Sequence, residues 1–170
     1  NNIEHVWYFL KRCQERGLIY LAHLALPWCI RCGTSLSEHE LLGTDSYQEV
    51  THTAVYIRLP LKGKDDQYFL VWTTTPWTLS ANVALAVHPE FNYALVEQDE
   101  ARYILVQAKA KELLPRGKIL STFQGKDLEG IEYMAPFEEF AAEKGVQHRV
   151  ILWEEVGEEE GTGIVHIAPG

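Results

Sequence analysis

The sequence is short of cysteine, with three in 170 residues: Cys13, Cys29 and Cys32. An odd count with one close pair does not fit a secreted scaffold held together by disulfides, and it fits a reducing compartment. We therefore expect a cytoplasmic location for this chain.

Basic residues are also scarce. The chain has 15 Lys and Arg against 24 Asp and Glu, which gives a formal net charge of −9. Broad binding to a nucleic-acid duplex requires clustered Lys and Arg to neutralise phosphates, so this balance argues against a DNA partner. If RNA is the partner, we expect it to be held by a short end in a pocket.

Long apolar runs are missing as well. They stay well below the roughly 20 residues that a membrane-spanning helix needs, so we expect no membrane partner. The first residues do not resemble a signal peptide. The sequence begins at Asn1 without Met and stops at Gly170 just after an apolar run, and we expect it to be a piece of a larger protein.

The hydrophobic pattern that is present begins with a helix. Ile3, Val6, Trp7, Leu10 and Cys13 recur at helical spacing, with Gly17 at the position of a helix C-cap. The apolar segment over residues 18–28 is predicted to be extended.

Further along, the period changes to two, which is typical of strands. Residues 55–61 and 67–73 form a predicted hairpin, and Pro60 indicates an edge strand. Further strands are predicted at 83–87, 93–97, 104–107, 150–152 and 164–167, with short helices at 107–114 and 136–144. Many short strands with few helices predict a mainly β or α+β fold, with a compact, barrel-like β core and peripheral helices.

Two segments could carry chemistry. Thr73, Thr74 and Thr75 place three hydroxyls where a strand ends at Pro76, and such a cluster can hold an ester, a ribose hydroxyl and a water. Threonine runs are also simply good strand material. In residues 161–169, His166 shares the strand face of Ile164. It could be a base, a hydrogen-bond donor, a pocket wall or only a structural histidine.

Two further segments have weaker implications. Cys29 and Cys32 followed by Gly33 form half of a tetrahedral zinc site, and the partner cysteines are absent from the sequence. Five glutamates lie between residues 154 and 160 in a predicted loop. Such a run is usually a solvated surface, although one carboxylate could hold a substrate ammonium.

Several motifs together resemble one family, the isoleucyl-tRNA synthetases, in the editing domain that is inserted as connective polypeptide 1 (CP1) of these class I enzymes. They are the threonine-rich segment 72–79 with residues 82–84 after it, the His-containing segment 161–169, and the cysteine segment 27–34. The resemblance covers essentially the whole chain. Leucyl and valyl relatives carry Arg where this chain has Thr75, and they lack His166.

This resemblance implies two parts and a set of roles. Residues 1–45 would be an N-terminal helix with the zinc-knuckle half, and residues 46–170 an editing domain truncated at its C-terminal side. Thr73, Thr74, Thr75 and Asn82 would be the catalytic residues. Trp77, Thr78 and His166 would form a pocket too small for isoleucine. Cys29 and Cys32 would be metal ligands only in the full-length enzyme.

The implied function is that of an aminoacyl-ester hydrolase within an isoleucine–tRNA ligase. It would remove valine from Val-tRNA(Ile) with a positioned water, and it would require no cofactor. The partners would be the charged 3′ end of tRNA(Ile) and the rest of the synthetase. The family's aspartate that binds the aminoacyl ammonium would lie beyond Gly170. Two alternatives remain: a zinc-dependent RNA-binding or structural module, and an editing fold that has lost activity and only binds tRNA or a partner chain.

Overall fold

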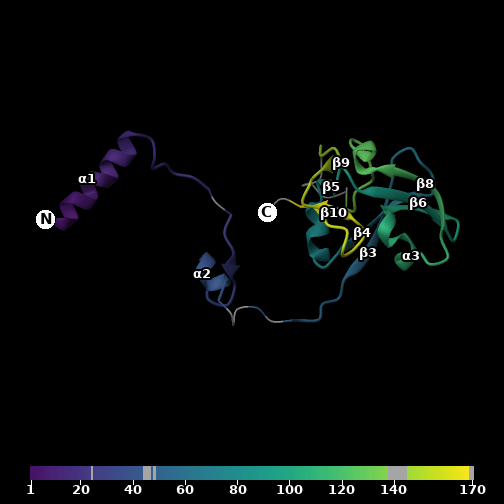
Figure 1. Ribbon diagram of the computed structural model, residues 1–170, viewed down its shortest axis with the longest axis horizontal. Helices are drawn as coiled ribbons and strands as arrows, with labels where there is room; N and C mark the ends of the chain where they lie inside the picture. The colour runs from purple at the N-terminus through teal and green to yellow at the C-terminus, as the bar shows by residue number, and fades with distance from the viewer. Residues whose placement is uncertain (24, 44–46, 48, 138–144, 169–170) are drawn as a thin grey trace. The chain divides into compact units, whose positions relative to one another are not determined.

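The computed structural model describes residues 1–23, 25–43, 47, 49–137 and 145–168 (Figure 1). The chain divides into two compact units, Asn1–Val50 and Thr51–Gly170. The division at residue 45 that the family resemblance implies stays a prediction. None of the helices in the described part of the chain has the length and apolar character of a membrane span.

The smaller unit begins with the predicted helix, α1 (Asn2–Glu15). The Asn1 side chain accepts a hydrogen bond of 3.2 Å from the backbone N–H of Ile3, which caps the free N–H groups of the first turn. Gly17 has a φ of +69°, a left-handed conformation that ends the helix. The unit continues with β1 (Trp28–Cys29), β2 (Thr34–Ser35) and α2 (Glu38–Leu41).

The larger unit contains a five-stranded sheet with the strand order β3-β4-β7-β6-β8. Its strands are β3 (Val55–Pro60), β4 (Gln67–Thr73), β6 (Asn92–Gln98), β7 (Ala101–Val106) and β8 (Lys118–Gln124). The predicted hairpin of β3 and β4 is confirmed, with β3 at the sheet edge where Pro60 lacks a ladder N–H. β4 then pairs with β7 in parallel.

A second sheet of three strands has the order β10-β5-β9, and Figure 1 shows the three strands grouped together. The central strand β5 (Ala84–Val87) is buried along its whole length, and it has a neighbouring strand on each side. β9 (Arg149–Leu152) pairs with it in parallel and β10 (Ile164–Ile167) in antiparallel orientation. All three strands were predicted from their apolar runs.

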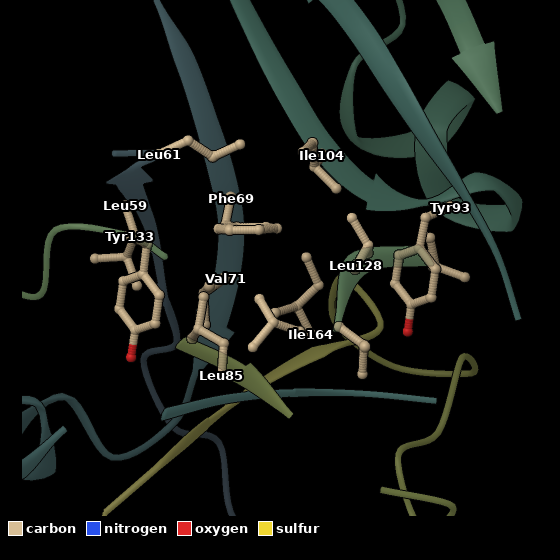
Figure 2. Packing of buried hydrophobic residues seen from close by; sticks show 13 residues of the cluster. Leu59, Leu61, Phe69, Val71, Leu85, Tyr93, Ile104, Leu128, Tyr133 and Ile164 are labelled. Atoms are coloured by element: carbon tan, nitrogen blue, oxygen red, sulfur yellow. The ribbon is translucent and has the colours of Figure 1, made fainter. Parts of the chain in front are cut away.

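The main core lies between these sheets. Alternate side chains of the strands point into it, among them Phe69 and Val71 of β4, Leu85 of β5 and Ile164 of β10 (Figure 2). These residues are at most 2% exposed. A smaller apolar cluster lies on the opposite face of the five-stranded sheet and includes Leu114, which follows the short helices η2 (Gln107–Lys109) and α3 (Ala110–Leu113).

The prediction of a mainly β fold is confirmed, and the predicted helix at 107–114 is present as η2 and α3. The described strands form two open sheets rather than a closed barrel, with β3 and β8 as edges of the larger one. Strand β8 was not predicted, and neither were the 3₁₀ helices η1 (Pro76–Ala81) and η3 (Gly125–Leu128). The predicted helix at 136–144 falls mostly outside the described residues.

Candidate functional site

The threonine-rich segment lies at the end of a strand, as its sequence predicts. β4 ends at Thr73, and the chain turns through Thr74 and Thr75 into η1, which has Pro76 in its first turn. Proline cannot donate to a sheet ladder but fits the start of a helix, so it fixes the place where the strand stops. Thr73 is 5% exposed, whereas Thr74 and Thr75 are exposed.

Three of the threonine hydroxyls form a continuous line. Thr73 Oγ1 lies 3.3 Å from Thr75 Oγ1, and it accepts a hydrogen bond of 3.1 Å from the backbone N–H of Thr75. Thr75 Oγ1 lies 3.4 Å from Thr78 Oγ1. Thr78 donates to the Thr75 carbonyl oxygen at 2.7 Å. The hydroxyls are therefore held by backbone groups as well as by one another.

The line ends at His166 on β10. Thr78 Oγ1 lies 2.9 Å from His166 Nε2, so the structure joins the two segments that the sequence marked separately. The strand alternation is also as predicted: Ile164 is buried, Val165 is exposed and His166 is half-buried.

The protonation of His166 follows from these contacts. Burial lowers the pKa of His166 below its ordinary value of 6.5, which favours the neutral ring at pH 7. The single hydroxyl proton of Thr78 is directed to the Thr75 carbonyl, so we assign the proton of the imidazole to Nε2, which donates to Thr78 Oγ1. Nδ1 is then an unprotonated acceptor, buried and without a partner in the described part of the chain.

Two glycines place β10 beside the first sheet. Gly161 and Gly163 have φ values of +71° and +69°. A Cβ atom on Gly161 would lie 2.8 Å from the Trp72 ring, and one on Gly163 would lie 2.6 Å from Val106 Cβ. Both positions therefore need glycine, for conformation and for the close approach that brings His166 to the threonines.

Asn82 is fully buried just after η1. Its amide donates to the Ala84 carbonyl at 3.1 Å, and its Oδ1 accepts a hydrogen bond from the Tyr133 hydroxyl. The side chain is thus used within the fold, where it fixes the passage from η1 into β5. Among the described residues, no hydrogen bond joins it to the line of threonine hydroxyls.

The remaining predicted residues of the site are exposed. The Trp77 side chain is 72% exposed, and among the described residues the hydroxyl of Thr74 has no hydrogen-bond partner. The structure brings Thr73, Thr75, Thr78 and His166 together, while Thr74 and Trp77 remain open to solvent.

Tyr93 is a residue of the site that the sequence did not indicate. Its hydroxyl donates to the Gly163 carbonyl at 2.7 Å and accepts from the backbone N–H of His88 at 3.1 Å. Burial raises its pKa to about 12, so it remains a neutral donor. In the sequence it looks like any core aromatic residue of a strand.

The acidic run borders a cavity of about 300 Å³. Its lining includes Trp72, Glu159, Glu160 and residues 161–165. Among the residues that the structure describes, no hydrogen bond or ion pair of these carboxylates points to a ligand, and a role in holding an ammonium stays a hypothesis.

Cys29 ends β1, and Cys32 lies in the tight turn between β1 and β2. The backbone N–H of Cys32 donates to Cys29 Sγ at 3.3 Å, and this bond lowers the pKa of the Cys29 thiol. Gly33, with a φ of +68°, closes the turn. The geometry fits half of a zinc site, since a coordinating thiol must be deprotonated. In the described residues no third His, Cys, Asp or Glu joins the pair.

Comparison with known sequences decides the family. No protein-family model matches the chain. It is 47% identical to the isoleucine–tRNA ligase of Thermus thermophilus and 43% identical to that of Thermococcus kodakarensis, over 98% and 99% of this chain. Isoleucine–tRNA ligase 2 of Bacillus cereus is 41% identical over 98% of it. The chain belongs to the isoleucine–tRNA ligase family. It spans only 16% to 17% of the length of these relatives.

Solved structures agree on the fold of this ligase segment. GlLeuRS-CP1 matches with a TM-score of 0.57 at 20% identity, over 67% of this chain and 52% of its own. The cytosolic leucyl-tRNA synthetase editing domain of P. knowlesi matches with a TM-score of 0.55 at 13% identity, over 66% and 57%. The chain thus has the fold of these editing domains.

Proposed function

We propose that the chain is a proofreading hydrolase that cleaves the ester of Val-tRNA(Ile). The observation that carries this proposal is the line of contacts from Thr73 through Thr75 and Thr78 to His166. It gathers hydroxyls and a neutral imidazole at the end of β4, in a fold shared with editing domains.

The chemistry needs such a second site. Valine is smaller than isoleucine by one methylene, and a synthetic pocket that fits isoleucine cannot exclude it strongly; isoleucyl-tRNA synthetase is the established example of this limit. A hydrolytic site too small for isoleucine discriminates in the opposite direction. The aminoacyl ester of wrongly charged tRNA is then hydrolysed, and the ester of correctly charged tRNA is left intact.

A positioned water is the proposed nucleophile. A threonine hydroxyl attacks an ester only when a base takes its proton. The hydroxyl of Thr75 contacts only other threonine hydroxyls in the described structure, and the nearest imidazole nitrogen already donates to Thr78. We propose that Thr73, Thr74 and Thr75 hold the terminal ribose, the ester and the water, and that hydrogen-bond donors stabilise the developing oxyanion.

The remaining residues have supporting roles in this proposal. His166 acts as a wall, because its one free nitrogen, Nδ1, is buried and cannot take a proton from a water in an open site. Thr78 orients the imidazole, and Trp77 closes the pocket when the tRNA end is bound. Asn82 is a positioning residue that holds the chain after η1.

We further propose that editing needs no cofactor and that the chain works in the cytoplasm. The charged 3′ end of tRNA(Ile) and the remainder of the synthetase are its partners. In the full-length enzyme Cys29 and Cys32 would supply two thiolates to a zinc ion, which would stabilise the fold of the smaller unit.

The test is hydrolysis of Val-tRNA(Ile) and Ile-tRNA(Ile) by the 170-residue chain, and by a chain extended through the family's ammonium-binding aspartate. Selective cleavage of the valyl ester is expected, at least from the longer chain. Thr75→Val keeps the shape and removes one hydroxyl of the line, so it should lower the rate about tenfold or more. Thr122→Val on the exposed strand β8 is the matched control and should leave the rate unchanged.

Two results would contradict the proposal. If the valyl and isoleucyl esters are hydrolysed equally fast, the proposed pocket does not select its substrate by size. If the extended chain is inactive both alone and within its parent enzyme while it still binds tRNA, the editing fold has lost its activity.

A further inference from the structure

The outer face of the five-stranded sheet, on the side opposite the main core, carries a group of aromatic side chains. Tyr56 and Arg58 of β3, Tyr68 of β4 and Tyr103 of β7 share this face, because Arg58 is in register with Leu70 and Tyr68 with Tyr103. We call these four residues the tyrosine–arginine platform. Leu70 continues into the smaller apolar cluster under α3.

The platform is held by contacts among its own members. The guanidinium carbon of Arg58 lies 5.4 Å from the centroid of the Tyr68 ring. Arg58 Nη1 donates a hydrogen bond of 3.5 Å to the Tyr103 hydroxyl. The ring centroids of Tyr68 and Tyr103 are 6.1 Å apart. These contacts fix the orientation of Arg58. They are made with uncharged tyrosines, so they do not neutralise its positive charge.

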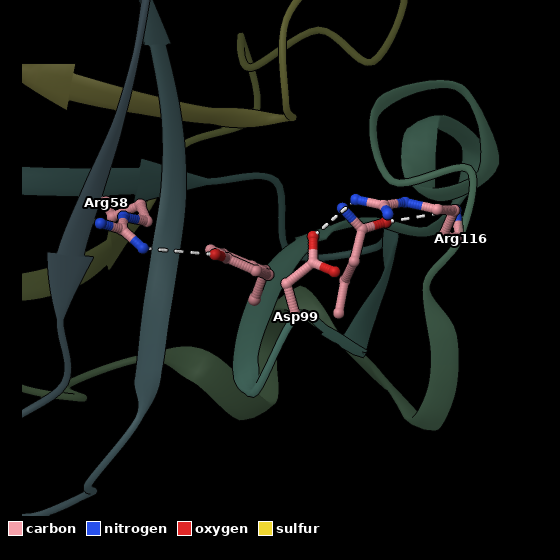
Figure 3. Close-up of polar contacts among 5 residues, drawn as sticks. Arg58, Asp99 and Arg116 are labelled. Atoms are coloured by element: carbon pink, nitrogen blue, oxygen red, sulfur yellow. Dashed lines mark hydrogen bonds and ion pairs between the residues drawn. The ribbon is translucent and has the colours of Figure 1, made fainter.

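Arg58 is not neutralised. In the described part of the chain it has no carboxylate partner, whereas Arg102 lies 3.6 Å from Glu97 and Arg116 lies 2.8 Å from Asp99. Figure 3 shows the contrast between Arg58, which points at the tyrosine hydroxyl, and the Arg116–Asp99 pair. A preoriented cation without an acid, in a chain of net charge −9, indicates an anionic ligand.

A cavity of about 320 Å³ opens beside this arginine. Tyr56, Arg58 and Tyr103 line one part of it, and Leu70, Leu113 and Leu114 line the rest. Its volume lies within the range of small-ligand sites. One cation beside exposed aromatic and apolar surface matches a ligand with one negative charge and one flat ring.

We propose that this cavity binds one nucleotide of single-stranded RNA, with the base stacked on Tyr56 and Tyr103, the tyrosines that line it, and the phosphate paired with Arg58. The proposal rests on the proposed function, which supplies tRNA as the partner, and it adds a contact outside the hydrolytic site. Bases stack on aromatic side chains without sequence readout, and Arg supplies the phosphate contact. A single arginine can pair with the phosphate of a single nucleotide. The net negative charge of the chain disfavours contacts with a longer run of phosphates.

The test uses the 170-residue chain and a fluorescently labelled oligocytidylate RNA hexamer, followed by fluorescence anisotropy. The hexamer carries a 3′-phosphate, so that it lacks the free ribose end that the editing site accepts. We expect saturable binding that Arg58→Gln weakens about tenfold. Arg116→Gln removes a charge from the same unit and should change the affinity less than about twofold. A hexamer without bases should bind about tenfold more weakly, because stacking is lost.

Three outcomes would overturn the proposal: no saturable binding, equal losses in the two arginine variants, or equal affinity for the hexamer without bases. The absence of saturable RNA binding would favour a protein surface as the partner of the platform. Urea unfolding of both variants checks that they fold, and Arg58 is exposed on an edge strand. Thr75→Val should lower the rate of hydrolysis about tenfold or more and leave hexamer binding unchanged, so the two proposals fail separately.

Discussion

The Tyr93 hydroxyl donates a hydrogen bond of 2.7 Å to the carbonyl oxygen of Gly163, across 70 residues of sequence. The bond joins strand β6 of the large sheet to the loop that leads into β10. It therefore helps to hold the start of β10, the strand that carries His166, although Tyr93 itself is fully buried and cannot touch a substrate.

Tyr93→Phe should destabilise the chain by about 1–3 kcal/mol, because it leaves the Gly163 carbonyl and the His88 N–H buried without their partner. Urea unfolding measures the effect. Tyr56→Phe, which removes a half-exposed hydroxyl, should change stability by less than about 0.5 kcal/mol. An equal effect of both substitutions would mean that the Tyr93 bond has no special role.

Gly163→Ala should cost more than Gly130→Ala. Both glycines have positive φ, +69° and +77°, so they share the conformational cost of a side chain. An added Cβ at 163 would lie 2.6 Å from Val106, whereas at 130 it meets nothing within 4 Å. We expect an extra loss of about 1–3 kcal/mol for Gly163→Ala in urea unfolding. Equal losses would show that the loop can move away from Val106 freely.

Acidification should destabilise the chain through His166. Its pKa is lowered by burial, so the folded state binds fewer protons there than the unfolded state. The stability that the neutral ring contributes is complete above its ordinary pKa of 6.5 and is lost as pH falls through the lowered value. Urea unfolding between about pH 7.5 and about pH 5 should show a smaller loss for His166→Asn than for the original chain. Identical pH profiles would contradict the assignment of a neutral His166.

His166→Ala should change specificity rather than abolish hydrolysis. Removing the imidazole enlarges the proposed pocket, so that Ile-tRNA(Ile) becomes a substrate. We expect the ratio of valyl to isoleucyl ester cleavage to fall about tenfold or more, the scale of one methylene in a pocket. His52→Ala, at an exposed position of the same unit, is the control. A variant that still spares isoleucine would show that His166 is not the wall.

The sequence predicted most elements of the fold but not how they assemble. Alternation of apolar residues identified β3, the turn after it indicated β4 as its hairpin partner, and an apolar run identified β10. Strand β8 gave no such signal, since only Phe123 in it is even half-buried. The parallel pairing of β4 with β7 joins residues far apart in sequence. Periodicity says which face of a strand is buried and nothing about its neighbours.

The candidate site was predicted in the same uneven way. The resemblance to a family marked the threonines and His166, but no local pattern indicates that Thr78 and His166 lie 2.9 Å apart. The supporting tyrosines Tyr93 and Tyr133 were missed because a buried hydroxyl and a plain core aromatic look alike in sequence. Their hydrogen bonds depend on the three-dimensional arrangement alone.

The strand order of the three-stranded sheet also determines when this sheet can form during synthesis of the chain. Its central strand, Ala84–Val87, is flanked by Arg149–Leu152 and Ile164–Ile167, so both neighbours leave the ribosome long after it. Non-local pairings of this kind form late and slowly. Until residue 152 has emerged, β5 lacks both partner strands, and until His166 has emerged the threonines have no imidazole beside them. A nascent chain that stops short of β10 would therefore lack His166 beside the threonines, and one edge of its apolar strand β5 would remain without a partner strand.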